Sequence, residues 1–591
     1  MGSSRDAGRD PCLPSAEALA EDLYVLGGVA EIDGRLSWAP PTVRGHAPIN
    51  AYLIQDPTTP TLIDTGVALH RDAILSGLDE TLETDEKLSV FLTRSEYECI
   101  GNIGAVAASR GIDALYAGGA SNPFDAFDDI AATAWLNRIR LGRVPFQERL
   151  RLPGSERIDV VAPPIRTLAT YWAYDVPTRT LFTSDLFGHG ITQEAPTTRL
   201  ITKTPPALDE KWVRDMVLAK FWWLAVADQI AVVRRNFDQL FELCDVEIIA
   251  PTHGMVFVGR EVVERQRELL DDVLRDLERS ASTHDTGRRP QKPVDHASEG
   301  PAQHSAITTP TSKRTLPRQI APGIHWLGPC VDGGSVNLRG GMYHSHLSLY
   351  ALIGREHSLL VDTGLPSGWP TLERELDQVF GDRAPTWIFP THPEFPHSGN
   401  LQALLDRYPE AQVIGDMRDY HLFFPGIEAR STHVTPGHRL DLGGLSCEFV
   451  PAMLKDLPST LWLYEATEQV LFAADGFSYF HRQPETEDEE EDDVPVHLAG
   501  ECGLFVSELD SELDAEQAVM IIANALSWSR YVDAEPLFEI IEAFLVDHPV
   551  RLIAPAHGNL IDDVERTISI IREAHDAAFA GASFSLPNAP S

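Results

Sequence analysis

The sequence contains few cysteines and none of the cysteine patterns that build metal or redox sites. They lie singly along the chain, at Cys12, Cys99, Cys244, Cys330, Cys447 and Cys502. Because no C-x-x-C pair occurs, a zinc ribbon, a cysteine-ligated iron–sulfur cluster and a dithiol redox motif are excluded. The scattered spacing gives no disulfide framework either, so we expect the reducing environment of the cytosol.

Positive charge and long apolar runs are also scarce. Lysine and arginine number 48 against 88 aspartates and glutamates, which gives a formal net charge of −40. A chain this acidic repels nucleic acid and anionic lipid surfaces, so neither is an expected partner. No run approaches the roughly 18 apolar residues of a membrane-spanning helix, and the N-terminal segment lacks the apolar core of a secretory signal. We therefore expect a soluble, cytoplasmic protein with no membrane partner.

The length and composition are those of a globular protein with more than one domain. A chain of 591 residues, 43% hydrophobic and 23% charged, can build several cores. Residues 281–318 are rich in Pro, Ser, Thr, Gly and charge and contain almost no large apolar side chains, which predicts a disordered linker. Residues 485–493 are acidic at eight of nine positions, and this run is most simply a solvated loop.

Two long blocks flank the linker and share the same landmarks in the same order. We place them at residues 20–280 and 319–580, with tails at 1–19 and 581–591. The recurring landmarks are LIDTG at 62–66 and LVDTG at 360–364, TRSEYECIGN at 93–102 and THPEFPHSGN at 391–400, LFTSDLF at 181–187 and LFAADGF at 471–477, and IAPTHG at 249–254 and IAPAHG at 553–558. The nearly constant offset of about 300 residues indicates a duplicated domain.

Short apolar runs precede the landmarks, and helical patterns separate the runs. In the second block the runs are SLLVDTG, TWIFPTH, QVLFAAD and VRLIAPAH, which have the length and composition of buried strands that end on a polar residue. Apolar residues recur at helical spacing between them, as at 369–380 and 564–579, and in the first block over 211–233. Strands mixed with helices at this length predict layered α/β domains.

A cluster of metal-ligand residue types follows one of these strands in the second block. His392, Glu394 and His397 lie on one short loop between a strand and a helix. Imidazole nitrogen and carboxylate oxygen suit iron, manganese or zinc, and three such side chains on one loop can converge on a cation. Asp475 and His557 end two further strands and can close the set from other sides.

The order D-T-G, T-H-x-E-x-x-H-S-G-N, F-x-x-D-x-F and A-P-x-H-G resembles the metallo-β-lactamase fold superfamily. The likeness is greatest to its oxygen-binding diiron branch, the catalytic domain of flavodiiron proteins. Zinc hydrolases of the superfamily carry H-x-H-x-D-H and the diiron branch carries H-x-E-x-D-H, so Glu394 favours the diiron branch. The resemblance covers both blocks and implies an α/β fold of two tandem αββα sandwiches, with the site between sheet edges.

The resemblance also implies a ligand set for the second block. His392 and Glu394 would hold one metal ion, His397 and His557 the other, and Asp475 would bridge the two. We predict no catalytic residues beyond these metal ligands.

Two positions of the second block depart from the family pattern. Pro396 stands where the family has an aspartate, and a further family histidine has no counterpart. Ungapped counting places Asp456 at the position of that histidine, and a carboxylate there would complete the first metal's ligands. Asp362, in the D-T-G turn, would fix the ligand loop by hydrogen bonds rather than bind metal itself.

The implied function is that of a non-haem iron oxidoreductase, or of a protein that binds O2 or NO, holding one or two iron ions. Flavodiiron proteins carry a flavodoxin domain with FMN, whereas a second metallo-β-lactamase-like block stands in its place here. No flavodoxin-type phosphate-binding loop stands out, so we expect no bound FMN. Electrons for a small-molecule oxidant would come from a separate donor protein, such as a flavodoxin, a rubredoxin or a reductase.

In the first block the same site reads as degenerate. Its residues are Arg94, Glu96, Glu98, Cys99, Arg166, Asp185 and His253. Because a guanidinium stays charged and pairs bidentately with carboxylates, we predict that Arg94 and Arg166 replace the metal charge. The glutamates and Asp185 would then form a buried salt-bridge network. The alternative is residual metal binding by Glu98, Cys99, Asp185 and His253.

A degenerate block would act much as the second subunit of a homodimer does. The segment 211–244, with Trp222 and Trp223, is either plain core or the apolar contact between the blocks. The acidic run 485–493 follows Asp475 closely in sequence, so it would lie near the site mouth, where it could attract a basic donor protein or repel anionic substrates.

Two other functions stay open at this point. One is a zinc-dependent hydrolase of the same superfamily that cleaves an ester, a thioester or a lactone. The other is a non-catalytic protein whose two sites have both decayed, as Pro396 and the first block indicate. Metal content separates the three, because iron supports the oxidoreductase, zinc supports the hydrolase, and the absence of metal supports the non-catalytic protein.

Overall fold

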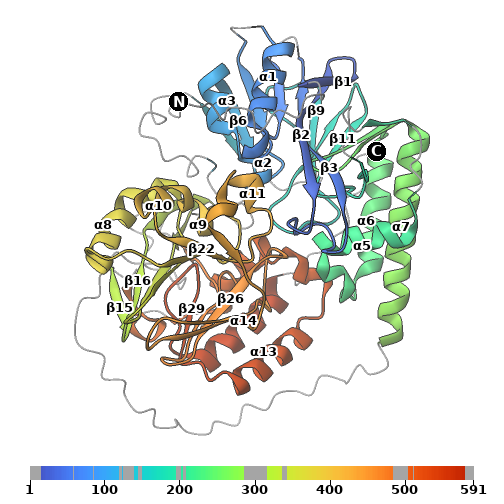
Figure 1. The fold of residues 1–591 in the computed structure, drawn as a ribbon. Coiled ribbons are helices and arrows are strands. Elements are labelled where there is room, and N and C mark those ends of the chain that lie inside the picture. The colour runs from blue at the N-terminus through green and yellow to red at the C-terminus, as the bar shows by residue number, and fades with distance from the viewer. Residues whose placement is uncertain are drawn as a thin grey trace, which may run out of the picture.

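The computed structural model describes residues 15–56, 59–83, 86–118, 123, 139–143, 149–194, 201–203, 208–284, 316–335, 342–482, 503–509 and 512–578. Figure 1 shows two sheet-rich halves, an N-terminal half up to residue 284 and a C-terminal half from residue 316. Most of the predicted linker, the whole acidic run 485–493 and most of both predicted tails lie outside the described residues. Within the described ranges, none of the helices combines the length and apolar composition needed to cross a bilayer.

The first sheet of the N-terminal half starts antiparallel and continues in parallel. β2 (Leu23–Ile32) pairs with β3 (Gly45–Ile54) along its full length, whereas β4 to β7 pair in parallel. Its outer face is covered by α1 and α3, which bury Leu78 and Val106 against the strands. The other elements are β1 (Ala16–Ala20), β4 (Thr61–Ile63), η1 (Ala68–His70), α1 (Arg71–Thr81), β5 (Leu88–Phe91), α2 (Tyr97–Ile100), α3 (Ile103–Arg110), β6 (Ile112–Ala117) and β7 (Arg140–Arg143).

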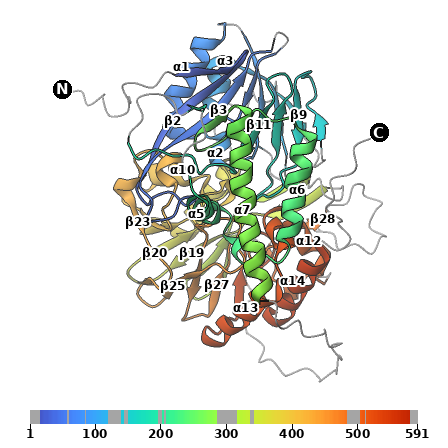
Figure 2. The same ribbon diagram turned by 90° about the vertical axis from the view of Figure 1, so that its right-hand side faces the viewer.

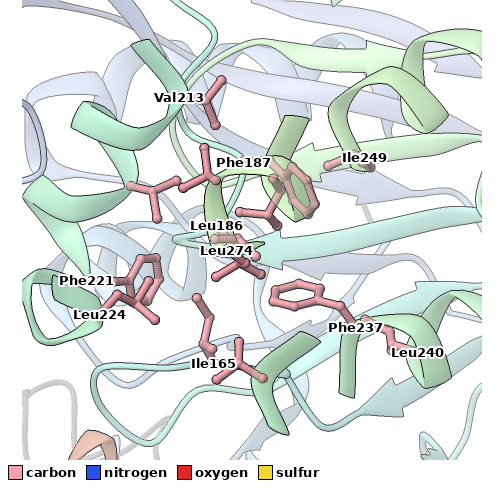
Figure 3. Packing of buried hydrophobic residues seen from close by; sticks show 14 of the residues in the cluster. Ile165, Leu186, Phe187, Val213, Phe221, Leu224, Phe237, Leu240, Ile249 and Leu274 are labelled. Atoms are coloured by element: carbon pink, nitrogen blue, oxygen red, sulfur yellow. The ribbon is translucent and has the colours of Figure 1, made fainter. Parts of the chain in front are cut away.

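The second sheet of this half has the order β12-β14-β13-β11-β10-β9-β8 and is covered by α5, α6 and α7. Figure 3 shows Phe187 and Ile249 of the sheet side packed against Val213, Phe237 and Leu274 of the helices. The elements are β8 (Arg149–Arg151), β9 (Ile158–Val161), β10 (Trp172–Asp175), β11 (Thr180–Ser184), β12 (Ile201–Thr202), α5 (Glu210–Lys220), η3 (Trp222–Ala225), α6 (Ile230–Leu243), β13 (Ile248–Pro251), β14 (Val256–Val258) and α7 (Arg260–His284).

The single helical pattern predicted over 211–233 is interrupted in the structure. α5 ends at Lys220, the short turn η3 follows, and α6 starts at Ile230. The backbone N–H groups of Asp228 and Gln229, between η3 and α6, both donate to the carbonyl oxygen of Tyr531 in the C-terminal half. The break therefore allows these backbone groups to contact the C-terminal half. The helical periodicity of the sequence does not reveal this contact.

The C-terminal half repeats this arrangement. Its first sheet, in the order β15-β16-β19-β20-β21-β22-β23, carries α8 and α10 on its outer face. The elements are β15 (Arg318–Ala321), β16 (Ile324–Leu327), β19 (Leu349–Ile353), β20 (Ser358–Val361), η4 (Pro366–Gly368), α8 (Trp369–Phe380), β21 (Trp387–Phe389), α9 (Phe395–Ser398), α10 (Leu401–Arg407), β22 (Gln412–Gly415), α11 (Tyr420–Phe423), η5 (Ile427–Arg430) and β23 (Ser431–His433).

The second sheet of the C-terminal half, in the order β24-β25-β26-β27-β29, is covered by α12, α13 and α14. A small sheet, β17-β18-β28, is also present. The elements are β17 (Cys330–Ser335), β18 (Met342–His346), β24 (Arg439–Asp441), β25 (Ser446–Pro451), β26 (Leu461–Glu465), β27 (Val470–Phe472), β28 (His481–Arg482), η8 (Val506–Glu508), α12 (Ala515–Asn524), η9 (Ser527–Tyr531), α13 (Glu535–Asp547), β29 (Leu552–Ala554) and α14 (Val564–Ala578).

In each half the two large sheets face each other across a buried core. Phe91 and Phe182 belong to this layer in the N-terminal half, and Phe389 and Phe472 belong to it in the C-terminal half. Helices cover the outer faces, so each half is an αββα sandwich, which confirms the predicted α/β class and the two tandem sandwiches.

Strand pairing shows the internal duplication at residue level. Ile63 pairs with Phe91 in the first half, and Val361 pairs with Phe389 in the second. The parallel pairs β11–β13 and β27–β29 also correspond. The recurring landmarks predicted from sequence therefore end equivalent strands.

The D-T-G turn has one backbone shape in both halves. Asp64 and Asp362 have φ values of 55° and 62°, in the left-handed region, and Gly66 and Gly364 have φ values of 69° and 72°. Aspartate tolerates this region better than most residues, and glycine enters it without steric cost. The turn points each aspartate side chain back toward the threonine that follows the next strand.

Aromatic contacts join the two halves in at least two places among the described residues. In one, the ring of Trp223 stacks on Tyr531 with centroids 5.3 Å apart, and Trp222 meets Trp528 edge to face. In the other, Tyr97 stacks on Phe395 with centroids 4.1 Å apart. Figures 1 and 2 show the two halves side by side, with α7 extending past the junction. The tryptophans of segment 211–244 thus belong to the core and to the contact between halves at once.

Candidate metal centre

The predicted ligands of the C-terminal half come together at one edge of the sandwich. His392 and Glu394 follow β21, and His397 lies on α9 one turn later. Asp475 follows β27 and His557 follows β29, and these two strands pair in parallel. Because the strands run in the same direction, their carboxyl ends bring both side chains to the same edge.

His392 lies among three carboxylates. Its Nε2 atom is 2.9 Å from Oε2 of Glu394, 3.0 Å from Oδ2 of Asp456 and 3.5 Å from Oδ2 of Asp475. Asp456 comes from the loop after β25 and is fully buried. The residue that ungapped counting selected, Asp456, therefore lies beside His392.

Asp475 lies at the centre of the cluster. Its Oδ2 atom is 3.4 Å from Nε2 of His397, and its Oδ1 atom is 3.3 Å from Nε2 of His557. With His392 included, the Nε2 atoms of all three imidazoles face this one carboxylate. His392, Glu394, His397 and Asp475 each offer a ligand atom within 4.8 Å of the others.

Burial and mutual charge shift the pKa values of the acidic groups in opposite directions. Burial and the charges of Asp456 and Asp475 raise the pKa of Glu394 well above its ordinary value. Burial would also raise the pKa of Asp475, but His397 and His557 hold it well below its ordinary value. The cluster therefore contains acidic groups whose pKa values are strongly shifted in opposite directions. Such shifts are common at sites that bind a cation.

Asp362 and Thr391 orient the imidazoles. Asp362 accepts hydrogen bonds from the backbone N–H and the hydroxyl of Thr391, and its Oδ2 atom lies 3.0 Å from Nδ1 of His397. Nδ1 of His392 lies 3.2 Å from the same hydroxyl. With Nδ1 engaged in this way, Nε2 of each ring is left to face the cluster, as in metal sites whose histidines are held by a carboxylate.

Several polar atoms of the cluster are buried and make no hydrogen bond. They are Nε2 of His397, Oδ2 of Asp456 and Oδ1 of Asp475. Leaving such atoms unsatisfied costs free energy, and a divalent cation at this position would satisfy all three. Nitrogen and carboxylate oxygen are suitable donors for iron or zinc, so the residues present fit a metal ion.

In the N-terminal half two buried cations stand among the corresponding carboxylates. Nη1 of Arg94 lies 2.6 Å from Oδ2 of Asp185, and its Nη2 contacts Glu98. Nζ of Lys220, at the end of α5, lies 3.1 Å from Oδ1 of Asp185 and 3.6 Å from Glu98. The pKa of Glu98 is lowered to about 2, because Lys220 and Arg94 outweigh burial. Two side-chain cations thus neutralise two carboxylates in this half.

The structure corrects the prediction for Arg166. The second cation of the network is Lys220, while Arg166 donates from Nη2 to the carbonyl oxygen of Ala523 across the junction. Burial and the neighbouring Arg530 lower the pKa of Arg166 to about 10. Counting along the sequence located the position of Arg166 but not the direction of its long side chain, which reaches the other half.

The prediction for Glu96 needs the same kind of correction. Arg94 directs its Nη atoms to Glu98 and Asp185, and the carboxyl group of Glu96 instead interacts with Glu394 and Asp456 of the C-terminal half. Glu96 therefore lies at the boundary of the two sites, where the charge of Arg94 also acts on it.

The remaining residues of the N-terminal site are buried. Sγ of Cys99 lies 3.4 Å from the hydroxyl of Thr93, and burial raises the pKa of this thiol well above its ordinary value. The His253 ring stacks on Trp38, and burial lowers its pKa to about 4. Glu98, Asp185 and His253 each offer an atom within 4.8 Å of the others, as a metal would need. Arg94 and Lys220 already pair with the carboxylates, which disfavours a further cation there.

A family model and several curated proteins match part of the chain. Residues 346–498 match the model of the metallo-beta-lactamase superfamily. Among curated proteins, the chain is 25% identical over 253 residues to the coenzyme F420H2 oxidase of Methanothermobacter thermautotrophicus, which covers 41% of this chain and 57% of that protein. It is 24% identical over 249 residues to the nitric oxide reductase of Moorella thermoacetica, covering 41% of this chain and 57% of that protein.

Solved structures similar to the chain include two flavodiiron-type proteins. The rubredoxin oxygen:oxidoreductase of Desulfovibrio gigas is 15% identical with a TM-score of 0.32, covering 45% of this chain and 61% of that one. The flavodiiron protein of Giardia intestinalis is 15% identical with a TM-score of 0.31, covering 46% and 61%. The chain spans less than two thirds of the length of the relatives and structures named here.

The family match identifies a metallo-beta-lactamase superfamily domain at residues 346–498 of the sequence. The curated relatives that match the chain include an oxidase and a reductase.

Proposed function

We propose that the C-terminal half is a metal-dependent oxidoreductase centre that holds non-haem iron and passes electrons to O2 or NO. The observation that carries this proposal is the position of Asp475, whose two oxygens lie 3.3 to 3.5 Å from the Nε2 atoms of His392, His397 and His557. A carboxylate shared by three imidazoles can bridge two metal ions. The curated relatives named as an oxidase and a nitric oxide reductase support the reaction class.

The ligands divide into two groups around Asp475. His392, Glu394 and Asp456 lie on one side and would hold one ion with Asp475. His397 and His557 lie on the other and would hold the second ion. Bound iron would supply one-electron redox chemistry and open coordination positions to a small oxidant.

The chain itself keeps the ligands in place and the site dry. Asp362 holds His397 through Nδ1, which stabilises the orientation of the ring before a cation binds. His392, His397 and Asp475 are each at most 3% exposed, so the walls of the site exclude bulk water. Such burial strengthens every charge interaction inside the site.

Electrons would reach the centre from a separate donor protein. The described residues fold as two sandwiches related by the duplication. The net charge of −40 would attract a donor with a basic surface and make its association sensitive to salt.

The test is turnover of the iron-loaded protein. Reduced anaerobically with dithionite, freed of excess dithionite by desalting and then mixed with O2 or NO, the wild type should consume the oxidant, as followed with an electrode. His392→Ala and His557→Ala should abolish this consumption. Protein that holds zinc and hydrolyses an ester, thioester or lactone while leaving O2 and NO untouched would replace the proposal with a hydrolase.

A further inference from the structure

The duplication places a second glutamate opposite Glu394. Glu96 and Glu394 occupy equivalent positions 298 residues apart, and each immediately precedes a short helix, α2 or α9. Their backbones share an extended conformation, with φ and ψ of −119° and 163° at Glu96 and −123° and 154° at Glu394. Neither side chain caps its helix, so both carboxyl groups are available for other contacts.

The junction between the halves brings these two loops face to face. Next to the glutamates, the rings of Tyr97 and Phe395 stack with centroids 4.1 Å apart. The hydroxyl of Ser398 donates to the Tyr97 oxygen at 3.2 Å. Phe423 stacks on the Tyr97 ring as well, with centroids 5.1 Å apart. The segment that carries Glu96 is therefore fixed against the ligand loop of the C-terminal site.

The carboxyl group of Glu96 lies with those of Glu394 and Asp456. It shares a side-chain hydrogen bond with Glu394 and lies close enough to Asp456 for their charges to interact. Its Oε2 atom is buried and makes no hydrogen bond. Among the described residues, Arg94 is the nearby cation, but its Nη atoms pair with Glu98 and Asp185.

We propose that Glu96, contributed by the N-terminal half, is a further carboxylate ligand of the cation held by His392, Glu394 and Asp456. The proposal rests on the metal centre proposed above. The carboxyl groups of Glu394 and Asp456 lie beside the imidazole of His392, and that of Glu96 interacts with both of them. A divalent cation among these three carboxyl groups would relieve their mutual repulsion. The unpaired Oε2 of Glu96 then gains the partner that it lacks in the protein alone.

The N-terminal half thereby becomes part of the C-terminal site. At this position both halves carry glutamate, whereas the histidines on either side of it are replaced in the first half by Arg94 and Cys99. Arg94 pairs with carboxylates of its own half, whereas Glu96 would bind the cation of the other half.

The experiment is an anaerobic titration of the full-length apoprotein with Fe(II), and in parallel with Zn(II), for the wild type and a set of variants. Glu96→Gln should weaken binding at least about tenfold, as loss of a metal-supporting group does. Glu96→Asp keeps the charge and should recover part of the affinity. Glu98→Gln, the same change two residues along, and Tyr97→Phe, which removes the hydrogen bond to Ser398, should bind metal like the wild type.

Thermal unfolding of the same proteins separates a ligand from a structural residue. If Glu96 is a metal ligand, the apo form of Glu96→Gln should melt at or above the melting temperature of the apo wild type. Added metal should then raise the melting temperature of the variant less than that of the wild type. Equal affinity of Glu96→Gln and wild type would overturn the inference, and so would an equal loss in Tyr97→Phe or a lowered melting temperature of apo Glu96→Gln. A wild type that binds neither metal would overturn the proposed centre itself.

Discussion

Asp362 contacts the proposed metal centre directly through Oδ2, which lies 3.0 Å from Nδ1 of His397. We predict that Asp362→Asn lowers the affinity for Fe(II) about tenfold, because the amide supports the imidazole less well than a carboxylate does. Anaerobic metal titration measures this. Asp64→Asn is the matched control, since Asp64 occupies the equivalent turn in the other half and hydrogen-bonds to Thr93. Equal losses in the two variants would contradict the role assigned to Asp362.

A buried histidine outside the site makes stability depend on pH. Burial lowers the pKa of His575 from 6.5 to about 4, and neither ring nitrogen makes a hydrogen bond. Because the folded pKa lies below the unfolded one, the stabilisation is complete above about pH 6.5 and is lost as the pH falls toward 4.

We predict that His575→Leu flattens this dependence. Between pH 8 and pH 5 the wild type should lose about 2 kcal/mol more unfolding free energy than the variant does. Urea unfolding at the two pH values measures the difference. His438→Leu, at an exposed histidine, should leave the wild-type dependence in place. A wild type and a His575→Leu variant with parallel pH profiles would contradict the prediction.

Some residues of the site were predictable from sequence and others were not. His392, Glu394 and Asp475 could be found because each sits at the end of an apolar run whose strand character is unambiguous. Lys220 could not be found, because it ends a helix whose spacing alone gives no sign that its amine reaches Asp185. Glu96 could be recognised as a site residue from sequence, but its interaction with Glu394 could not, since sequence order says nothing about how two sandwiches face each other.

At the scale of elements, α5 carries two lysines with opposite surroundings. Lys220 is 4% exposed and pairs with Asp185 and Glu98, whereas Lys211 is exposed and pairs with Asp215 one turn away. A buried ion pair that loses one partner leaves an uncompensated charge in a low-dielectric interior. An exposed pair contributes little.

We therefore predict that Lys220→Met destabilises the protein by about 3–5 kcal/mol. Lys211→Met should change the unfolding free energy by less than about 0.5 kcal/mol. Denaturant unfolding of both variants provides the comparison. If Lys220→Met were as stable as Lys211→Met, the two cations of the N-terminal half would not be the replacement for metal charge that the geometry indicates.

Helix prediction was most accurate where the apolar spacing was uninterrupted. The patterns at 369–380 and 564–579 correspond to α8 and α14, within a residue at the ends. The pattern at 211–233 failed at Phe221, because contacts with the C-terminal half stabilise a break there. The spacing of apolar residues predicts where a helix can form, but contacts between domains can interrupt a helix that this spacing favours.

For the whole molecule, aromatic contacts hold the two sandwiches together. Trp223 is fully buried and stacks on Tyr531, whose hydroxyl donates to the carbonyl oxygen of Pro164. Trp528 of the C-terminal half belongs to the same buried cluster as the N-terminal helices. Large aromatic side chains buried at a contact contribute most of its energy.

We predict that the halves stay associated after the chain between them is cut. A protease recognition sequence placed within 285–315 and cleaved should yield two fragments that co-elute in size-exclusion chromatography at micromolar concentration. Trp223→Ala should weaken this association. Fragments that separate fully in the wild-type background would contradict the junction described here.

The central claim is that imidazoles and carboxylates from distant parts of the C-terminal half surround a cation. Elemental analysis of anaerobically purified protein tests it most directly. The account predicts about two irons per chain in the wild type, from the two-sided arrangement around Asp475, and a loss of iron in His392→Ala and His557→Ala. A wild type without bound metal, or alanine variants that retain the full metal content, would contradict it.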